Sequence, residues 1–158
     1  MVTALERLLG DRLTRLTLGP LDHDGAVALV VDPQRDTDRV ERAARDAGVA
    51  ITHVAETHIH NDYVTGGLQL ARDHGATYLL NAADPVDFER TGVADGDSFT
   101  VGELQVDVVA TPGHTHSHLA YVVRHDGQEA VFSGGSLLYG SVGRTDLVRP
   151  EDTEPLTR

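Results

Sequence analysis

Cysteine is absent from the 158-residue sequence. Without cysteine the chain has no disulfide framework, no thiolate metal site and no cysteine nucleophile. A metal ion would have to be held by the nitrogen and oxygen atoms of His, Asp, Glu or Tyr side chains. The site chemistry is therefore restricted to nitrogen and oxygen ligands.

Positive charge is scarce as well. The chain has 13 Lys and Arg residues against 25 Asp and Glu residues, and its formal net charge is −12. No block of Lys or Arg interrupts this negative field. Because such a surface repels the phosphates of nucleic acids and of anionic lipids, we expect neither nucleic acid nor membrane as a partner.

The sequence also has no long apolar run. No window approaches the roughly 20 apolar residues that a membrane-spanning helix needs. The first residues lack the basic start, apolar core and cleavage site of a secretory signal. A cytoplasmic location is therefore expected.

What the chain does contain is a regular alternation of strand and helix patterns. The apolar run Ala26–Val31 stops at a proline and is typical of a strand buried on both faces. A helix follows and ends at Gly48, with apolar residues every three or four positions: Val40, Ala43, Ala44 and Ala47. A second strand is expected at Ile51–Ala55.

Helices and hairpins are mixed along the rest of the chain. The expected elements are a helix over Val64–His74, a strand over Thr77–Leu80, a hairpin over Ser98–Ala110 that turns at Gly102, and strands over Leu119–Arg124 and Ala130–Ser133. This order predicts an α/β (α+β) sandwich with sheets inside and helices outside.

The beginning of the chain has a different pattern. Leucines recur at helix-like spacing before residue 17, although Gly10 interrupts them. This segment is closer to a helix than to a hairpin. We therefore expect residues 1–25 to form a poorly defined N-terminal segment and residues 26–158 to form the domain.

Three candidate metal ligands alternate along one short segment: His58, His60 and Asp62. Alternate positions of an extended chain lie on one face. His114 lies in a second loop, TPGHT, where proline and glycine fix a tight turn after a strand. Three imidazoles suit one Zn(II) or Fe(II) ion and leave a position open, while Asp62 is expected as the fourth ligand or as the base that orients a water.

The alternative interpretation is chance, because nine histidines in this chain bring two of them close together by frequency alone. The additional carboxylate and the TPGHT loop favour the metal site. His116 and His118 are interpreted as outer partners of the site or as solvent-facing residues. Four other histidines have no partner pattern and are assigned to the surface or the core: His23, His53, His74 and His125.

Two further motifs are given structural roles. The pair Gly66-Gly67 lacks the context of a phosphate-binding loop and is expected to allow close packing beneath the site. Arg144 and Asp146 are expected to form an ion pair next to it.

The motifs resemble those of a known family. Residues 56–67, ETHIHNDYVTGG, look like the T-H-x-H-x-D-H-x-x-G-G signature of the metallo-β-lactamase fold, and residues 111–115 resemble its second ligand loop. Residues 132–138, FSGGSLL, and 143–146, GRTD, are similar to strings of persulfide dioxygenases, and residues 31–36, VDPQRD, fit an early strand and turn of the same group. The resemblance covers roughly residues 26–148.

The resemblance implies an αββα fold with metal at a sheet edge and a small thiol-linked substrate, either glutathione persulfide or a glutathione thioester. In relatives of the glyoxalase II type, two metals activate a water that attacks a thioester. In persulfide dioxygenases, one iron(II) binds dioxygen and the substrate sulfur. The fold does not choose between these reactions.

Three departures from the family pattern favour a second hypothesis, a truncated, non-catalytic member that acts as a binding or scaffold module or is a gene remnant. Tyr63 stands where the family has a histidine for a second metal. Gly135 stands where it has the aspartate that bridges two metals or completes an iron site. The family also continues beyond Arg158, so the sandwich is expected to be incomplete at its C-terminal end and to expose apolar sheet surface, which favours homo-oligomers.

Overall fold

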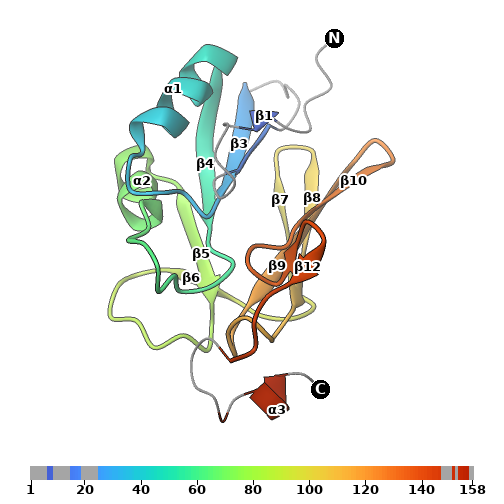
Figure 1. Cartoon of the computed structure of the whole chain (residues 1–158). Helices are drawn as coiled ribbons and strands as arrows, with labels where there is room; N and C mark the ends of the chain where they lie inside the picture. Colours follow the sequence, from blue (N-terminus) through green and yellow to red (C-terminus); the bar gives the residue numbers. More distant parts are fainter. Residues whose placement is uncertain (1–6, 9–14, 19–24, 147–150, 152, 157–158) are drawn as a thin grey trace.

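Two β-sheets face each other in this chain, and helices cover the outer face of one of them (Figure 1). The computed structural model describes residues 7–8, 15–18, 25–146, 151 and 153–156. The arrangement confirms the predicted sandwich with the sheets inside. None of the helices in these ranges is long and apolar enough to cross a membrane.

The first sheet has six strands in the order β1-β2-β3-β4-β5-β6. Their bounds are Arg7–Leu8, Arg15–Leu18, Ala26–Val31, Val49–Ala55, Thr77–Asn81 and Thr91–Val93. The strands from β3 to β6 pair in parallel, whereas β1, β2 and β3 pair antiparallel. The carboxyl ends of β3, β4 and β5 therefore meet at one edge, where open α/β sheets bind their ligands.

The helical interpretation of the N-terminal leucines is wrong for the described residues. Arg7 pairs with Leu16 and Leu8 with Arg15, so β1 and β2 form an antiparallel pair. Strand β2 then pairs with β3 over the four residues from Arg15 to Leu18. Pairing with an existing sheet edge outweighs a weak local helix pattern that a glycine interrupts. The leucines at positions 5, 9 and 13 lie outside the described residues.

Both predicted helices connect parallel strands. Helix α1 spans Asp38–Ala47 and ends at Gly48, as predicted. Helix α2 spans Gly67–His74, so it begins at Gly67 instead of Val64. Glycines in the left-handed conformation end both helices. The residues before Gly67 thus remain a loop, and this loop carries the histidine motif.

The second sheet is antiparallel, in the order β10-β9-β8-β7. Its strands are Ser98–Val101, Leu104–Ala110, Leu119–His125 and Gln128–Phe132, numbered β7 to β10. Two short strands, β11 (Leu137–Leu138) and β12 (Ser141–Val142), form a hairpin, and α3 (Thr153–Leu156) follows. The predicted hairpin at Gly102 and both later strands are confirmed. The short strands β6, β11 and β12 were not predicted.

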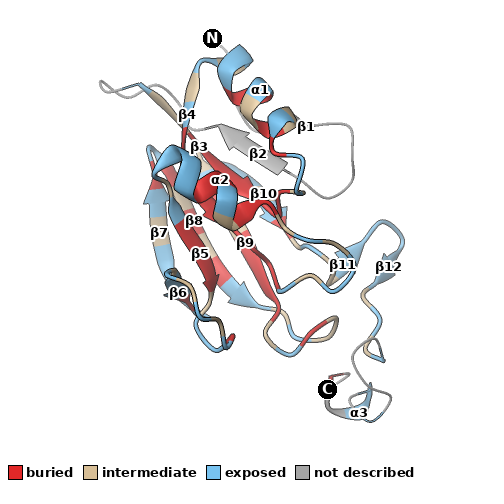
Figure 2. Cartoon of the chain, turned by 90° about the vertical axis from the view of Figure 1, so that its left-hand side faces the viewer, coloured by how far each residue is buried: buried red, intermediate tan, exposed pale blue. Residues whose placement is uncertain are grey.

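Two apolar clusters hold these layers together. The cluster between the sheets combines residues of β3, β4 and β5 with a larger set from the second sheet, including Leu119, Tyr121 and Phe132. The other cluster packs α1 and α2 against the opposite face of the first sheet. Buried residues accordingly lie in the strands of both sheets and in α1 and α2 (Figure 2).

The outer face of the second sheet carries charges as well as apolar side chains. Arg124 forms ion pairs with Asp107 and Glu129 there. Val109 and Val131 are exposed. The predicted apolar exposure therefore exists at these valines, but an ion-pair network interrupts it.

Candidate metal site

The predicted ligands lie at one end of the sandwich, where loops leave β3, β4 and β8 and a glycine turn leaves β10. A backbone bond ties the two sheets together there, because the Leu119 amide donates to the Thr57 carbonyl over 2.8 Å. The Tyr121 hydroxyl also donates to the Glu56 carbonyl over 2.8 Å. The loop that carries the histidine motif is thus anchored to both sheets.

Asp32, directly after β3, organises the first part of the site. It is buried and has a positive φ of 50°, a conformation that Asp tolerates better than most residues. Its carboxylate accepts hydrogen bonds from the Thr57 amide at 2.7 Å and from the Thr57 hydroxyl at 2.8 Å. The ends of two neighbouring parallel strands are therefore joined by one buried carboxylate.

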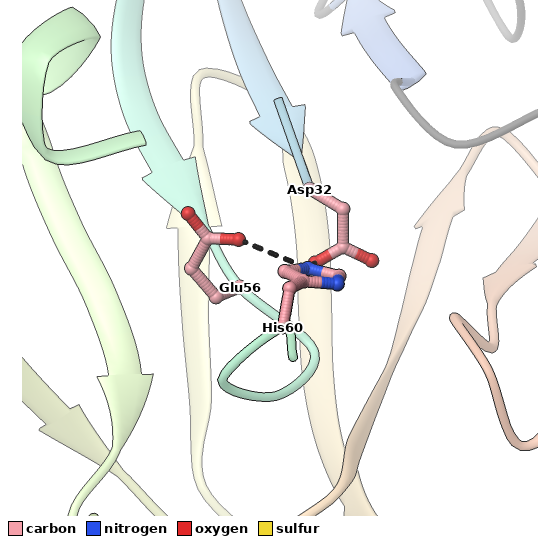
Figure 3. Close-up of side chains that lie close together, drawn as sticks. All are labelled: Asp32, Glu56 and His60. Atoms are coloured by element: carbon pink, nitrogen blue, oxygen red, sulfur yellow. Dashed lines mark hydrogen bonds and ion pairs between the residues drawn. The ribbon is translucent and has the colours of Figure 1, made fainter. Parts of the chain in front are cut away.

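His60 turns toward this carboxylate. Its Nε2 atom lies 3.2 Å from Asp32 Oδ1 and 3.4 Å from Glu56 Oε2 (Figure 3). Burial lowers the pKa of His60, but hydrogen bonds and charge from Asp32 and Glu56 outweigh burial and raise this pKa to about 9. Since Nε2 faces the carboxylates, Nδ1 is the ring nitrogen left for a metal ion.

Glu56 is the second buried acid of the site. Its side chain is 2% exposed and accepts hydrogen bonds from the Thr65 and Tyr78 hydroxyls. Burial raises the pKa of Glu56 to about 7, although the hydrogen bond with His60 lowers it. A side chain at Gly67 would overlap Glu56, so this glycine allows α2 to begin against the site, as expected.

His58 lies at the centre of the histidine cluster. Its ring centroid is 4.1 Å from that of His60, 4.8 Å from that of His114 and 4.9 Å from that of His118. The Thr57 hydroxyl gives its proton to Asp32, so it accepts from His58 Nδ1 at 2.9 Å and leaves Nε2 with a free lone pair. Burial, followed by the charge of His60, lowers the pKa of His58 to about 3, which keeps the ring neutral.

His118 belongs to this cluster and does not face solvent. Its side chain is buried, its Nδ1 lies 2.8 Å from the Thr111 hydroxyl, and its Nε2 has no hydrogen-bond partner within the described ranges. Burial lowers its pKa to about 4. The solvent-facing interpretation holds for His116, which is exposed, but is wrong for His118.

His114 packs against glycines. A Cβ atom at Gly135 would lie 2.7 Å from His114 Nε2, and one at Gly143 would lie 2.9 Å from His114 Cβ. The ring therefore fills the space that a side chain at position 135 would need. Burial lowers the pKa of His114, against the opposite effect of the Asp62 carboxylate. Asp62 itself is exposed.

The structure thus brings the predicted ligands into one region without closing them around a point. Among the described residues, the acidic and histidine groups whose ligand atoms all lie within 4.8 Å of one another are Asp32, Glu56 and His60. Sequence reasoning missed the roles of Asp32 and Glu56. Their positions could have indicated these roles, because Asp32 directly follows the apolar strand β3 and Glu56 directly follows β4.

The donor set fits one metal ion. Neutral imidazoles bind metals, and a ligating histidine usually holds a carboxylate or a hydroxyl with its second nitrogen. His58 and His60 both show this arrangement, on Thr57 and on Asp32. Two positions at which the family pattern places donors for a second ion offer none or a poor one: Gly135 has no side chain, and the Tyr63 hydroxyl lies 3.0 Å from His60 Nε2 with a raised pKa caused first by burial.

Two facing sheets, with helices on the outer face of one of them and a histidine cluster at one end of the strands, define an α/β sandwich. The chain belongs to the metallo-beta-lactamase superfamily, whose family model matches residues 21–157.

Among curated proteins, the chain is similar to the hydroxyacylglutathione hydrolases of Rhizobium johnstonii and Acidiphilium cryptum. The first is 34% identical over 130 residues, which are 80% of this chain and 50% of the relative. The second is 36% identical over 124 residues, which are 77% of this chain and 49% of the relative. The chain therefore spans about half the length of the curated relatives it matches.

Solved structures give the same result. The crystal structure of ETHE1 from Myxococcus xanthus has a TM-score of 0.76 and 30% identity, and the match covers 93% of this chain and 63% of that one. A metallo-beta-lactamase from Staphylococcus aureus has a TM-score of 0.72 and 30% identity over 77% of this chain and 39% of its own. The chain is a distant relative of both the hydroxyacylglutathione hydrolases and ETHE1.

Proposed function

We propose that the chain binds one metal ion through His58, His60 and His114 and catalyses hydrolysis of a small thioester of the glutathione type. The observation that carries this proposal is the hydrogen-bond network of Asp32 and Thr57, which orients two imidazoles before any ion binds. Preset ligands lower the ordering cost of binding.

Zinc is the ion we assign first and iron(II) the second. Three imidazole nitrogens with an open position are a common catalytic zinc set. Iron oxygenases use two histidines and one carboxylate, and Gly135 offers no carboxylate. Persulfide oxidation is one of the two reactions that the sequence resemblance implies. It would need Asp62 to supply the carboxylate ligand of the iron. Thioester hydrolysis needs no such ligand and is therefore better supported.

The chain's own residues have distinct roles in this scheme. When bound, the ion would act as a Lewis acid and lower the pKa of a water molecule, which makes that water nucleophilic near neutral pH. Asp62, the exposed carboxylate of the histidine loop, accepts the proton of the attacking water or serves as a fourth ligand. Asp32 holds the His60 ring, and Thr57 holds the His58 ring. The hydroxyacylglutathione hydrolases among the relatives support a glutathione thioester as substrate.

A non-catalytic binding module is the second candidate. The observation that favours it is the packing of His114 over Gly135, which excludes the side chain that the family pattern carries there. Such a module would retain the fold and the buried Asp32 network without turnover.

Metal analysis and two assays test the proposal. The purified chain is loaded with zinc or iron(II), and hydrolysis of a hydroxyacyl-glutathione thioester and oxygen uptake with glutathione persulfide are both measured. We expect about one equivalent of zinc and thioester hydrolysis that a chelator abolishes. Metal binding without either activity would support the binding module, and failure to bind metal in a folded chain would refute the site.

A further inference from the structure

We propose that His118 is an additional ligand of this metal ion and takes the coordination position that Gly135 leaves without a side chain. The inference rests on the proposed metal site, but it concerns a residue outside the sequence motifs that define that site. Four histidines, with no carboxylate in the place of Gly135, would then surround the ion.

The first argument is the unpaired ring nitrogen. His118 is 1% exposed, and its buried Nε2 has no hydrogen-bond partner among the described residues. An unpaired buried polar atom costs about 1–3 kcal/mol, so a native chain normally gives it a partner. A metal ion within the histidine cluster is a partner of the right chemistry for a neutral imidazole.

The second argument is a repeated arrangement of two side chains. The Nδ1 atom of His58 lies 2.9 Å from the Thr57 hydroxyl, and the Nδ1 atom of His118 lies 2.8 Å from the Thr111 hydroxyl. In both cases a threonine holds the outer nitrogen and leaves Nε2 for the cluster. Such outer hydrogen bonds fix the ring orientation of metal ligands.

The third argument is spacing. Two imidazoles bound to one zinc at about 2.0–2.1 Å have ring centroids about 5 Å apart. The His58 centroid lies 4.9 Å from that of His118 and 4.8 Å from that of His114. The His114 and His118 centroids are 6.0 Å apart, so these two rings must draw closer to share one ion.

The glycine turn after β10 gives the ring its room. A Cβ atom at Gly134 would lie 3.0 Å from His118 Nε2. His118 Nε2 thus faces the same turn from which the family pattern would project a carboxylate at position 135. In this proposal His118, directly before β9, replaces the carboxylate that the family pattern carries at position 135, after β10.

Zinc affinity of variants tests the role of His118. Zinc binding to the purified chain is measured by competition with a chromogenic chelator, for the wild type, His118→Ala, Thr111→Val and the matched control His125→Ala. Loss of an outer partner costs about 10–100-fold in metal affinity, so loss of a ligand should cost more than about 100-fold. We expect that loss for His118→Ala, a smaller loss for Thr111→Val, and no change for His125→Ala.

A mutation-free measurement guards against misfolding of the variant. The ¹⁵N chemical shifts of the histidine rings are recorded for the metal-free and zinc-loaded wild type, and His118 Nε2 should move to a metal-bound value while Nδ1 stays protonated. One equivalent of zinc with an unchanged His118 ring would overturn this inference and leave the proposed function intact. A wild type that binds no zinc would overturn both.

Discussion

The two sides of the candidate metal site position their histidines in different ways. On the side of β3 and β4, Asp32, Thr57, His58 and His60 are joined by hydrogen bonds between side chains. On the side of β8 and β10, the His114 side chain packs against two glycines, its ring against Gly135 and its Cβ atom against Gly143. His58 and His60 are thus positioned by polar contacts, whereas His114 is positioned by the absence of side chains at two glycines, so the histidines of one site are held by two different means.

The largest expected effect comes from His58, which contacts both sides. His58→Ala removes the central imidazole, so zinc affinity should fall by more than about 100-fold, beyond the cost of losing an outer partner. Elemental analysis of the purified variant, beside His125→Ala as control, checks this. Retention of a full equivalent of metal by His58→Ala would place the ion elsewhere.

Asp32→Asn tests the polar side. It removes the charge that pairs with His60 and weakens two bonds to Thr57, and breaking one partner of a buried pair costs about 3–5 kcal/mol. The free energy of unfolding of the metal-free chain should therefore fall by about 3 kcal/mol, measured by urea denaturation. A fall below 1 kcal/mol would mean that Asp32 does not organise this side.

The pH dependence of stability sharpens the contrast, because His60 carries a raised pKa and the His114 pKa is lowered. A group whose folded pKa of about 9 lies above its unfolded value of 6.5 contributes stability that is present below pH 6.5 and is lost as the pH rises through 9. In chelator, the unfolding free energy should fall by roughly 1–2 kcal/mol between pH 7 and 9.5. His60→Gln should abolish this slope, whereas His125→Ala should keep it.

Gly135 tests the other side, with the smallest effect. The methyl group of Gly135→Ala would overlap the Cγ, Cδ2 and Nε2 atoms of the His114 ring, so this side chain must move away, and zinc affinity should fall by about tenfold while stability changes little. Gly135→Asp should weaken binding in the same way, because its Cβ meets the same ring. The zinc affinity of both variants is measured by competition with a chelator. Tighter zinc binding by Gly135→Asp would show that position 135 accepts a carboxylate ligand.

The sequence predicted most of the fold because its signals are local. A proline after β3 and glycines after α1 and α2 mark where those elements end, and the alternating runs around Gly102 mark a hairpin. Strands β1 and β2 escaped prediction because pairing with β3 decides their structure. The three-residue strand β6 has too few residues to show a period.

The candidate site divides in the same way. His58, His60 and His114 stand in recognisable motifs, so their common region could be predicted. The buried partners of the site could not be, because Asp32 precedes Thr57 by 25 residues and reaches it only through the parallel pairing of β3 with β4. The burial of His118 depends likewise on packing between the two sheets.

The bonds from Leu119 to Thr57 and from Tyr121 to Glu56 bear on how the two sheets can move relative to each other. They join the start of the histidine loop to strand β9 of the second sheet. The two sheets cannot separate at this end without losing both hydrogen bonds. The Leu119 amide should therefore be among the slowest in the chain to exchange its hydrogen with solvent.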